Sequence, residues 1–399
     1  MVHRRRTTAC AASMPLLLWL AIGLTACRAS AQEIPVEQDR RPGNIAFDVP
    51  FNAEADTDNS SAPPVSPADE TLSRWHDLQR LPPVDQKNEL PIFGFGPGFG
   101  PGLASGMGPG NQGPISYRAF WFPNEPVKGQ AADWEMVGQD FSLACPLWVD
   151  APNRLMVTAG VHNRLIDTDA ILPDSHQPYP SELWNAQAGL MYLRQLSGDR
   201  MLGGGVSVGS ASDHPFASIG VMNVSMNAMY RIPSGEHNAW LFMVLYSPTS
   251  ELQFPIPMVS YSYNPSDQFH ANIGLPFMVL YKPTDRWSFV ASYMLIHTIH
   301  TKLSYKIAER VNAFAGYDWS NEVYTLRDRI VESDRFFLYD QRVTLGLDFP
   351  INSWLSAELV GGYAFNRFSF SGRQWNSVGT DRVDIDPGPF ISLRASVRR

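Results

Sequence analysis

The fold is decided by residues 342–366, RVTLGLDFPINSWLSAELVGGYAFN. Apolar residues occupy alternate positions in both halves, from Val343 to Phe349 and from Leu355 to Phe365, and polar or small residues hold most of the positions between them. An apolar period of two residues is typical of a β-strand and not of a helix. Pro350–Ser353, between the two halves, has residue types that favour a tight turn. The stretch therefore predicts an antiparallel β-hairpin.

The same pattern recurs along residues 115–399. Alternating runs such as Val311–Trp319 and Ile391–Val397 are separated by tight turns of Pro, Asp, Ser, Gly or Asn. These residue types favour turn geometry, and only the turn at Ala308–Glu309 is inferred from the runs on either side of it. The predicted turns lie at Asp150–Asn153, Ser197–Asp199, Pro233–Glu236, Asn264–Asp267, Pro283–Asp285, Ala308–Glu309 and Pro350–Ser353.

The composition excludes two other classes of protein. Of the 399 residues, 44% are hydrophobic, 18% are charged and 12% are aromatic. The charged fraction is below the usual quarter of a soluble domain, yet after residue 31 no apolar run approaches the ~20 residues that a spanning helix needs. A multi-span helical membrane protein is therefore excluded. The formal net charge of −8 also argues against binding to nucleic acid, which requires a concentrated basic face.

A soluble β-sandwich would also show alternation, and two features favour a membrane barrel instead. Several alternating runs last about 10 to 15 residues, longer than the ~5–6 residues of globular strands and long enough to cross a membrane at a tilt. Short turns also alternate with longer connections, at Asp167–Leu183, Ser247–Phe254 and Ser371–Pro389. Periplasmic turns and external loops of outer-membrane barrels differ in length in this way.

Aromatic residues supply a third feature, because they form two groups along the strands. Members of the two groups on one strand, such as Trp354 and Tyr363, can be nine residues apart. At ~3.3 Å per residue and a tilt of ~40°, about nine residues rise about 23 Å, which is close to the height of the apolar band between aromatic girdles. We therefore predict an all-β fold, a transmembrane up-and-down antiparallel β-barrel. The group beside the turns is Trp148, Tyr192, Tyr230, Trp240, Tyr281, Trp287, Tyr305 and Trp354, and the group farther along the strands is Tyr246, Tyr293, Tyr317, Tyr363 and Phe365.

The number of strands depends on one segment. Seven turns, with both ends of the barrel on the same side, would give about 16 strands, from Ile115–Phe122 to Phe390–Arg398. Phe269–Lys282 (FHANIGLPFMVLYK) forms either two short strands or one long one. Counting it as one, we predict about 14 strands, within a range of about 12 to 16.

The chain begins with an export signal. Residues 1–31 are interpreted as a signal peptide, because a basic start precedes the apolar segment Pro15–Leu24. Two processing sites overlap in it. Cleavage after Ala31 follows a small-residue site, whereas a lipobox-like sequence would leave Cys27 as a lipidated N-terminus.

Residues 32–114 differ in composition from the rest. They are rich in Pro, Gly and acidic residues and poor in aliphatic runs. Such a segment cannot bury enough apolar surface to offset its conformational entropy. We predict a disordered periplasmic linker at 32–114, followed by the barrel at 115–399.

Three segments of the barrel region carry a resemblance to a known family. They are IGLPF (273–277), YKPTDRW (281–287) and LSYKIAERVNAFAGY (303–317). With them, the chain resembles an uncharacterised family of bacterial outer-membrane β-barrels, a domain of unknown function, over roughly residues 115–399. The resemblance implies an outer-membrane location, insertion by the usual assembly machinery, and no established activity. The final Val397-Arg398-Arg399 departs from the terminal aromatic residue that such barrels usually carry.

Alternation also indicates which charged residues face the lumen. Two interpretations remain open for them. They form either a charged constriction that selects solutes or a lattice of ion pairs that fills a narrow barrel, and mixed signs on neighbouring strands suit both. The candidate lumen-lining residues are Lys302, Lys306, Arg342, Asp348, Glu358, Arg367, Arg394 and Arg398.

Catalytic and metal-binding patterns are weak. Asp213 and His214 lie in a predicted external loop, where such residues are common, so a barrel-embedded hydrolase is only a remote alternative. His297 and His300 are three positions apart, which on a strand places them on opposite sides, so they could share a metal ion only if they lay in a turn. The sequence therefore predicts no catalytic residues, no cofactor and no metal site.

These inferences predict a bacterial outer-membrane barrel that is not an enzyme. We expect a passive channel for small solutes, whose other partners are outer-membrane lipid and the assembly machinery. The alternative is a non-conducting structural or adhesive barrel that binds a partner through the loops Asp167–Leu183 and Ser371–Pro389.

Overall fold

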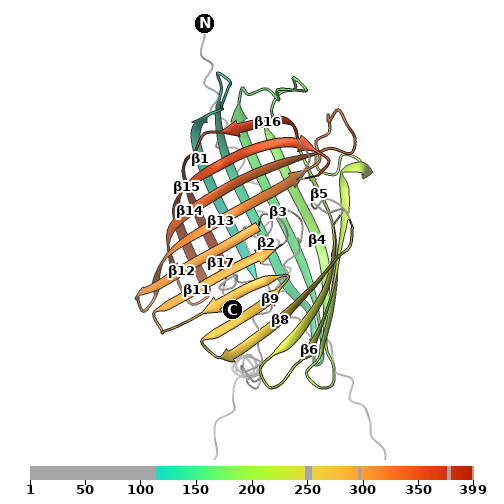
Figure 1. Cartoon of the computed structure of the whole chain (residues 1–399), viewed down its shortest axis with the longest axis vertical. Helices are drawn as coiled ribbons and strands as arrows, with labels where there is room; N and C mark the ends of the chain where they lie inside the picture. Colours follow the sequence, from blue (N-terminus) through green and yellow to red (C-terminus); the bar gives the residue numbers. More distant parts are fainter. Residues whose placement is uncertain (1–113, 248–253, 295–297, 375–378, 398–399) are drawn as a thin grey trace, which may run out of the picture. The chain divides into compact units, whose positions relative to one another are not determined.

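The computed structural model describes residues 114–247, 254–294, 298–374 and 379–397, and their strands form one sheet (Figure 1). The predicted signal peptide with Cys27, and the predicted linker up to residue 113, lie outside the described residues. The elements are β1 (Ile115–Pro126), β2 (Asp133–Asp150), β3 (Asn153–Thr168), β4 (Glu182–Gln195), β5 (Met201–Ser212), the 3₁₀ turn η3 (Ile219–Val221), β6 (Met222–Pro233), β7 (Ala239–Tyr246), β8 (Ile256–Ser266), β9 (Phe269–Gly274), β10 (Phe277–Tyr281), β11 (Trp287–Met294), β12 (Thr298–Ala308), β13 (Val311–Tyr324), β14 (Arg335–Pro350), β15 (Leu355–Gly372), β16 (Thr380–Ile385) and β17 (Gly388–Val397).

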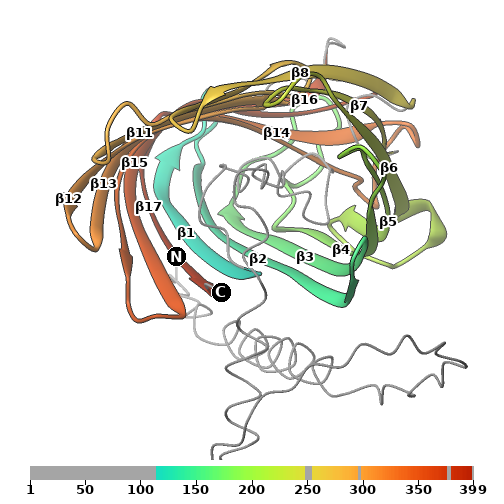
Figure 2. The same ribbon diagram turned by 90° about the horizontal axis from the view of Figure 1, so that it is seen from below.

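The sheet closes into a barrel because β1 pairs antiparallel with both β2 and β17 (Figure 2). Every other pairing between the named strands is antiparallel too, and nearly all join strands that follow one another in the chain. The predicted up-and-down antiparallel β-barrel is therefore confirmed. Among the described residues, no helix has the length and hydropathy needed to cross a membrane.

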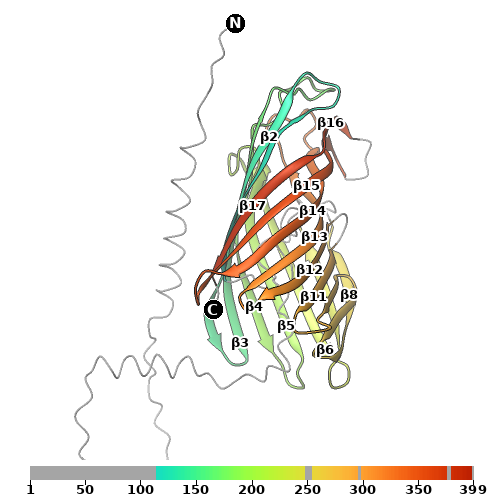
Figure 3. The ribbon, with the colours of Figure 1, turned by 90° about the vertical axis from the view of Figure 1, so that its left-hand side faces the viewer.

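The barrel has 16 strands, which lies at the upper limit of the predicted range of about 12 to 16 and shows that the preferred number of about 14 is wrong. β16 and β17 share one position in the wall, because β15 pairs with β16 from Arg367 onward and with β17 up to Ala364 (Figure 3). The error lies in residues 269–282, which form the two short strands β9 and β10. Gly274 has a positive φ of 129° and is followed by Leu275-Pro276, and a proline cannot donate to the sheet. This segment therefore turns the chain and does not continue the strand.

The two ends of the barrel differ in their connections. Each of the seven predicted turns lies at a connection between consecutive strands, from β2–β3 to β14–β15. We call this end the short-turn end and the opposite one the long-loop end. The predicted loop Ser371–Pro389 at the long-loop end contains β16, since Asp384 pairs with Phe368 on β15.

The outer face of the wall is apolar. On β7, Phe242 and Val244 are exposed and alternate with Leu241 and Met243, which are buried, and this alternation continues around the sheet. Near the short-turn end, the ring centroids of Trp287 and its outer-face neighbour Tyr305 are 4.7 Å apart. An apolar band edged by aromatic rings is the surface that a barrel presents to lipid.

Candidate functional site

The inner face of the barrel carries a group of charged side chains on β1–β3, β12–β15 and β17, which we call the charged sector. Its best-connected member is Asp140 on β2. Arg118 on β1 and Arg164 on β3 each place a guanidinium nitrogen 2.7 Å from a carboxylate oxygen of Asp140, and Nδ1 of His162 lies 2.8 Å away. Ionised partners at these distances make strong hydrogen bonds. Three neighbouring strands are therefore joined through one carboxylate.

Arg164 also joins two sides of the barrel that are not neighbours in the sheet. Its Nη2 lies 2.7 Å from Oε1 of Glu322 on β13, and Tyr324 donates its hydroxyl to Oε2 of Glu322 at 2.7 Å. The Arg164 and Glu322 side chains are both buried. Because a buried charge is costly unless it is paired and hydrogen-bonded, this contact fixes the position of β13 against β3.

A second set of ion pairs within the charged sector lies nearer the short-turn end. Glu358 on β15 accepts from Lys302 on β12 at 2.8 Å and lies 3.3 Å from Nη1 of Arg394 on β17. The Lys302 Nζ also lies 3.7 Å from the centroid of the Phe314 ring. The charges in this part of the lumen therefore compensate one another, both between the neighbouring strands β15 and β17 and between β12 and β15, which β13 and β14 separate in the sheet.

The structure places the sequence-predicted lumen residues on the inner face. Strand register puts Lys302, Lys306, Asp348, Glu358 and Arg394 there, although Arg398 lies outside the described residues. Arg342 and Arg367 are also on this face but are buried. Arg342 donates from Nε to Asp340 at 2.6 Å. Whether any of these residues selects solutes stays a prediction.

Sequence reasoning missed Arg118, Asp140, Arg164 and Glu322. A signal was present for Arg118, which alternates with the outer-face residues Tyr117 and Ala119. The partnership of Arg164 and Glu322 had no local signal, because 158 positions separate them in the chain.

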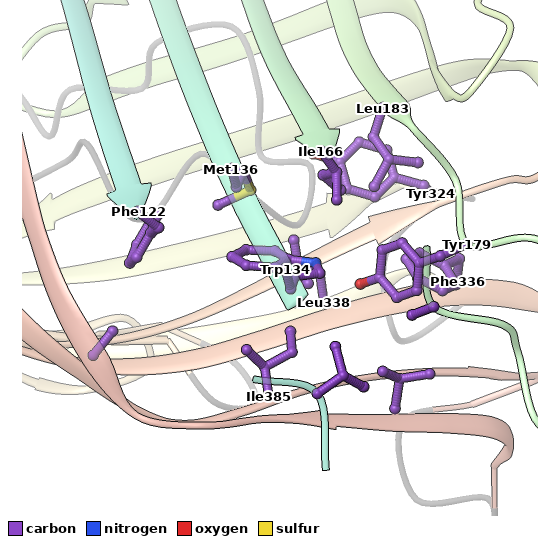
Figure 4. Packing of buried hydrophobic residues seen from close by; sticks show 14 of the residues in the cluster. Phe122, Trp134, Met136, Ile166, Tyr179, Leu183, Tyr324, Phe336, Leu338 and Ile385 are labelled. Carbon is purple, nitrogen blue, oxygen red and sulfur yellow. The ribbon is translucent and has the colours of Figure 1, made fainter. Parts of the chain in front are cut away.

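An apolar cluster, which we call the long-loop core, lies inside the barrel at the long-loop end (Figure 4). Trp134 of β2 and Phe336 of β14 belong to it. The connection between β3 and β4, residues 169–181, folds onto this cluster and buries Leu172 and Tyr179 in it. Burial raises the pKa of the Tyr179 hydroxyl to about 12. The predicted external binding loop thus buries Ala170, Leu172 and Tyr179 in the core, whereas its Ile171 is exposed.

Hydrogen bonds from backbone N–H groups join connections at the long-loop end in two places. The carboxylate Oδ1 of Asp381 on β16 accepts the backbone N–H of Asp174 at 2.9 Å and of Ser175 at 2.7 Å, and Asp174 accepts the N–H of Asp381 in return. On the other side, the N–H of Thr325 donates to the carbonyl of Ala211 at 2.8 Å, which joins the end of β13 to β5. These hydrogen bonds join the loop 169–181 to β16 and the end of β13 to β5 at the mouth of the barrel.

The inner face of β4 and β6–β8 is different, because it is apolar. We call it the apolar wall. Its side chains are buried and cluster with one another, and Met191, Met229, Met243 and Met258 are the methionines among them. Met is flexible and polarizable, so it packs against apolar groups of varied shape. The remaining buried members are Leu193, Leu241, Leu245 and Ile256.

The other candidate chemical groups serve structural contacts. Asp213 accepts the backbone N–H of Arg327 at 2.9 Å, and its carboxylate lies 3.3 Å from Nδ1 of His214. His300 contacts Asp318 on β13, and His297 lies outside the described residues. Within the part of the chain that the structure describes, no group of three or more His, Cys, Asp or Glu side chains could hold a metal ion.

Neither a protein-family model nor a curated protein matches the chain, so the resemblance to an uncharacterised family stays a prediction. Among solved structures, an outer-membrane channel from Pseudomonas putida F1 matches with 9% identity and a TM-score of 0.31, over 72% of this chain and 96% of the channel. A FadL homologue from Pseudomonas aeruginosa matches with 11% identity and a TM-score of 0.28, over 70% and 88%. The β-domain of the Bordetella autotransporter BrkA matches with 11% identity and a TM-score of 0.25, over 71% and 99%. TM-scores this low carry no argument about family or activity.

Proposed function

We propose that the protein is a passive outer-membrane channel for small solutes that have both a charged or polar part and an apolar part. The observation that carries the proposal is the division of the inner face into the charged sector and the apolar wall. Lys302 and Glu358 belong to the first, and Met243 and Met258 belong to the second. A solute with a charged head and an apolar tail matches the chemistry of both parts of the inner face, whereas a wholly polar solute matches only one of them.

An outer-membrane location is part of the proposal. The apolar outer face, with exposed side chains such as Leu345 and Leu393, would be costly in water over so large an area. In a membrane the same face contacts lipid, and the aromatic residues at its edge lie at the interface. The predicted export signal agrees with this location.

Flux through reconstituted protein tests the proposal. Hexanesulfonate and gluconate both have six carbons and one negative charge, but only hexanesulfonate has an apolar tail. We expect liposomes that contain the protein to swell several times faster in hexanesulfonate than in gluconate, relative to protein-free liposomes. A folded barrel that gives neither swelling nor ion conductance in a planar bilayer would contradict the proposal and favour a structural or adhesive barrel.

A further inference from the structure

Four polar side chains deep in the long-loop core have polar atoms without a hydrogen-bond partner among the described residues. These atoms are Nε1 of Trp134, the hydroxyl oxygens of Tyr179 and Ser369, and both terminal nitrogens of Arg367. The exposed fractions of the four residues are 1% for Trp134, 5% for Tyr179, 0% for Ser369 and 3% for Arg367. Buried polar groups without a partner are rare in native proteins, and several together indicate a missing ligand, ion or water.

The four side chains come from three segments of the chain and lie close together. Trp134 lies on β2, Tyr179 on the loop 169–181, and Arg367 and Ser369 on β15. The guanidinium carbon of Arg367 lies 4.4 Å from the Trp134 ring centroid. The Tyr179 hydroxyl lies close enough to the Ser369 hydroxyl and the Trp134 indole N–H to interact with both, although neither contact has the geometry of a full hydrogen bond. Figure 4 shows the indole nitrogen of Trp134 and the hydroxyl of Tyr179 directed toward one another.

The charge of Arg367 decides what kind of ligand fits. Within the described ranges Arg367 makes no ion pair, and the carboxylate of Asp340 is already bound by Arg342. Arg367 lies against the ring faces of Phe122 at 4.6 Å and Trp134 at 4.4 Å. Cation–π contacts and the electrostatic effect of the Asp340 and Glu125 carboxylates offset only part of the cost of burying this charge, and a water molecule would add no compensating charge.

We propose that Trp134, Tyr179, Arg367 and Ser369 bind one small monovalent inorganic anion, such as chloride. All four present an N–H or O–H group, and an anion accepts hydrogen bonds without donating any. The site is enclosed by the long-loop core, so it suits a single ion and not the head of a larger solute. The bound anion joins the loop 169–181 to β2 and β15 through Tyr179, and this role does not depend on whether the barrel conducts solutes.

Chloride binding can be measured on the folded barrel in detergent. The ³⁵Cl NMR line of the solution broadens when chloride exchanges with a protein site. We expect excess broadening with the wild-type protein that added bromide reverses and added acetate does not. Reversal by acetate would assign the site to a carboxylate and overturn the inorganic-anion proposal.

Variants identify the residues that bind the anion. Arg367→Met should abolish the excess broadening, and Tyr179→Phe and Ser369→Ala should each weaken chloride binding by about tenfold, since each removes one hydrogen bond to a charged group. Arg382→Met is the matched control, because Arg382 on β16 is exposed and pairs with Asp384 at 2.8 Å. It should leave the broadening unchanged.

Thermal unfolding gives a second readout. At constant ionic strength, the midpoint of the wild-type protein should fall by several degrees when gluconate replaces chloride, because a ligand that binds the native state stabilises it. The midpoint of Tyr179→Phe, which keeps the arginine, should depend less on chloride. Wild-type protein with the same midpoint in both salts and no excess ³⁵Cl broadening would overturn the proposal.

Discussion

Arg164 and Glu322 couple two walls of the barrel that the sheet itself does not join. Both side chains are buried, and Nη2 of Arg164 lies 2.7 Å from Oε1 of Glu322. We expect Glu322→Ala to lower the free energy of unfolding by about 3 kcal/mol, because it leaves Arg164 partly uncompensated in a dry environment. Chemical denaturation followed by tryptophan fluorescence measures this change. Lys128→Ala, which breaks the exposed Lys128–Asp386 pair at 3.8 Å, should cost less than about 1 kcal/mol. Equal costs for both variants would contradict the coupling.

At the scale of residues, the sequence indicates faces but not partners. Period-two alternation was sufficient to place Lys302, Glu358 and Arg394 on the inner face, because neighbouring side chains on a strand point in opposite directions. It could not show that Lys302 and Arg394 share Glu358, since that contact depends on the tilt and register of three strands. The same holds for the Trp134 and Tyr179 donors, which only the folded loop brings together.

At the scale of elements, the loop 169–181 depends on one carboxylate of β16. Asp381 has a positive φ of 57° and accepts two backbone N–H groups of the loop. We expect Asp381→Ala to increase hydrogen exchange of the amides of Asp174 and Ser175 by about tenfold, as measured by mass spectrometry of loop peptides, because each lost hydrogen bond is worth about 1 kcal/mol or more. Asp381→Asn keeps an acceptor and tolerates this backbone conformation, so its exchange should stay close to the wild type. Fast exchange in both variants would contradict this role.

The hairpin β9–β10 is the element for which the prediction from sequence was wrong, because it was counted as one strand. Its apolar run is compatible with one long strand. The turn requires glycine at position 274, because a Cβ atom added there would lie 2.3 Å from the carbonyl oxygen of Val259. We therefore expect Gly274→Ala to destabilise the barrel by about 2 kcal/mol or more, through backbone strain and this close contact. Gly361→Ala, whose Cβ would have no atom within 4 Å, is the control. The two variants are compared by their denaturation midpoints, after heat-modifiable gel migration has shown that both fold. An unchanged midpoint for Gly274→Ala would contradict the predicted strain.

At the scale of the whole molecule, strands with the same alternation of apolar and polar residues form a lumen with one charged part and one apolar part. The barrel class could be predicted from the sequence because the strands repeat the same alternation of apolar and polar positions. It did not predict the apolar wall, because Met191, Met229, Met243 and Met258 lie on four strands and are isolated in the sequence. Only closure of the sheet brings them onto one surface, opposite in character to the charged sector.

The apolar wall gives the proposed channel its sharpest test. Met243→Gln with Met258→Gln keeps side-chain size but replaces two apolar contacts with amides. We expect the ratio of hexanesulfonate to gluconate flux to fall by about thirtyfold, since each of the two contacts with an apolar tail contributes roughly 1 kcal/mol. Lys302→Met, which removes a cation of the charged sector, should lower the flux of both anions and leave their ratio nearly unchanged. Liposome swelling with variants that keep heat-modifiable migration measures both effects. If the ratio responds to Lys302→Met but not to the methionine pair, the apolar wall does not select the solute.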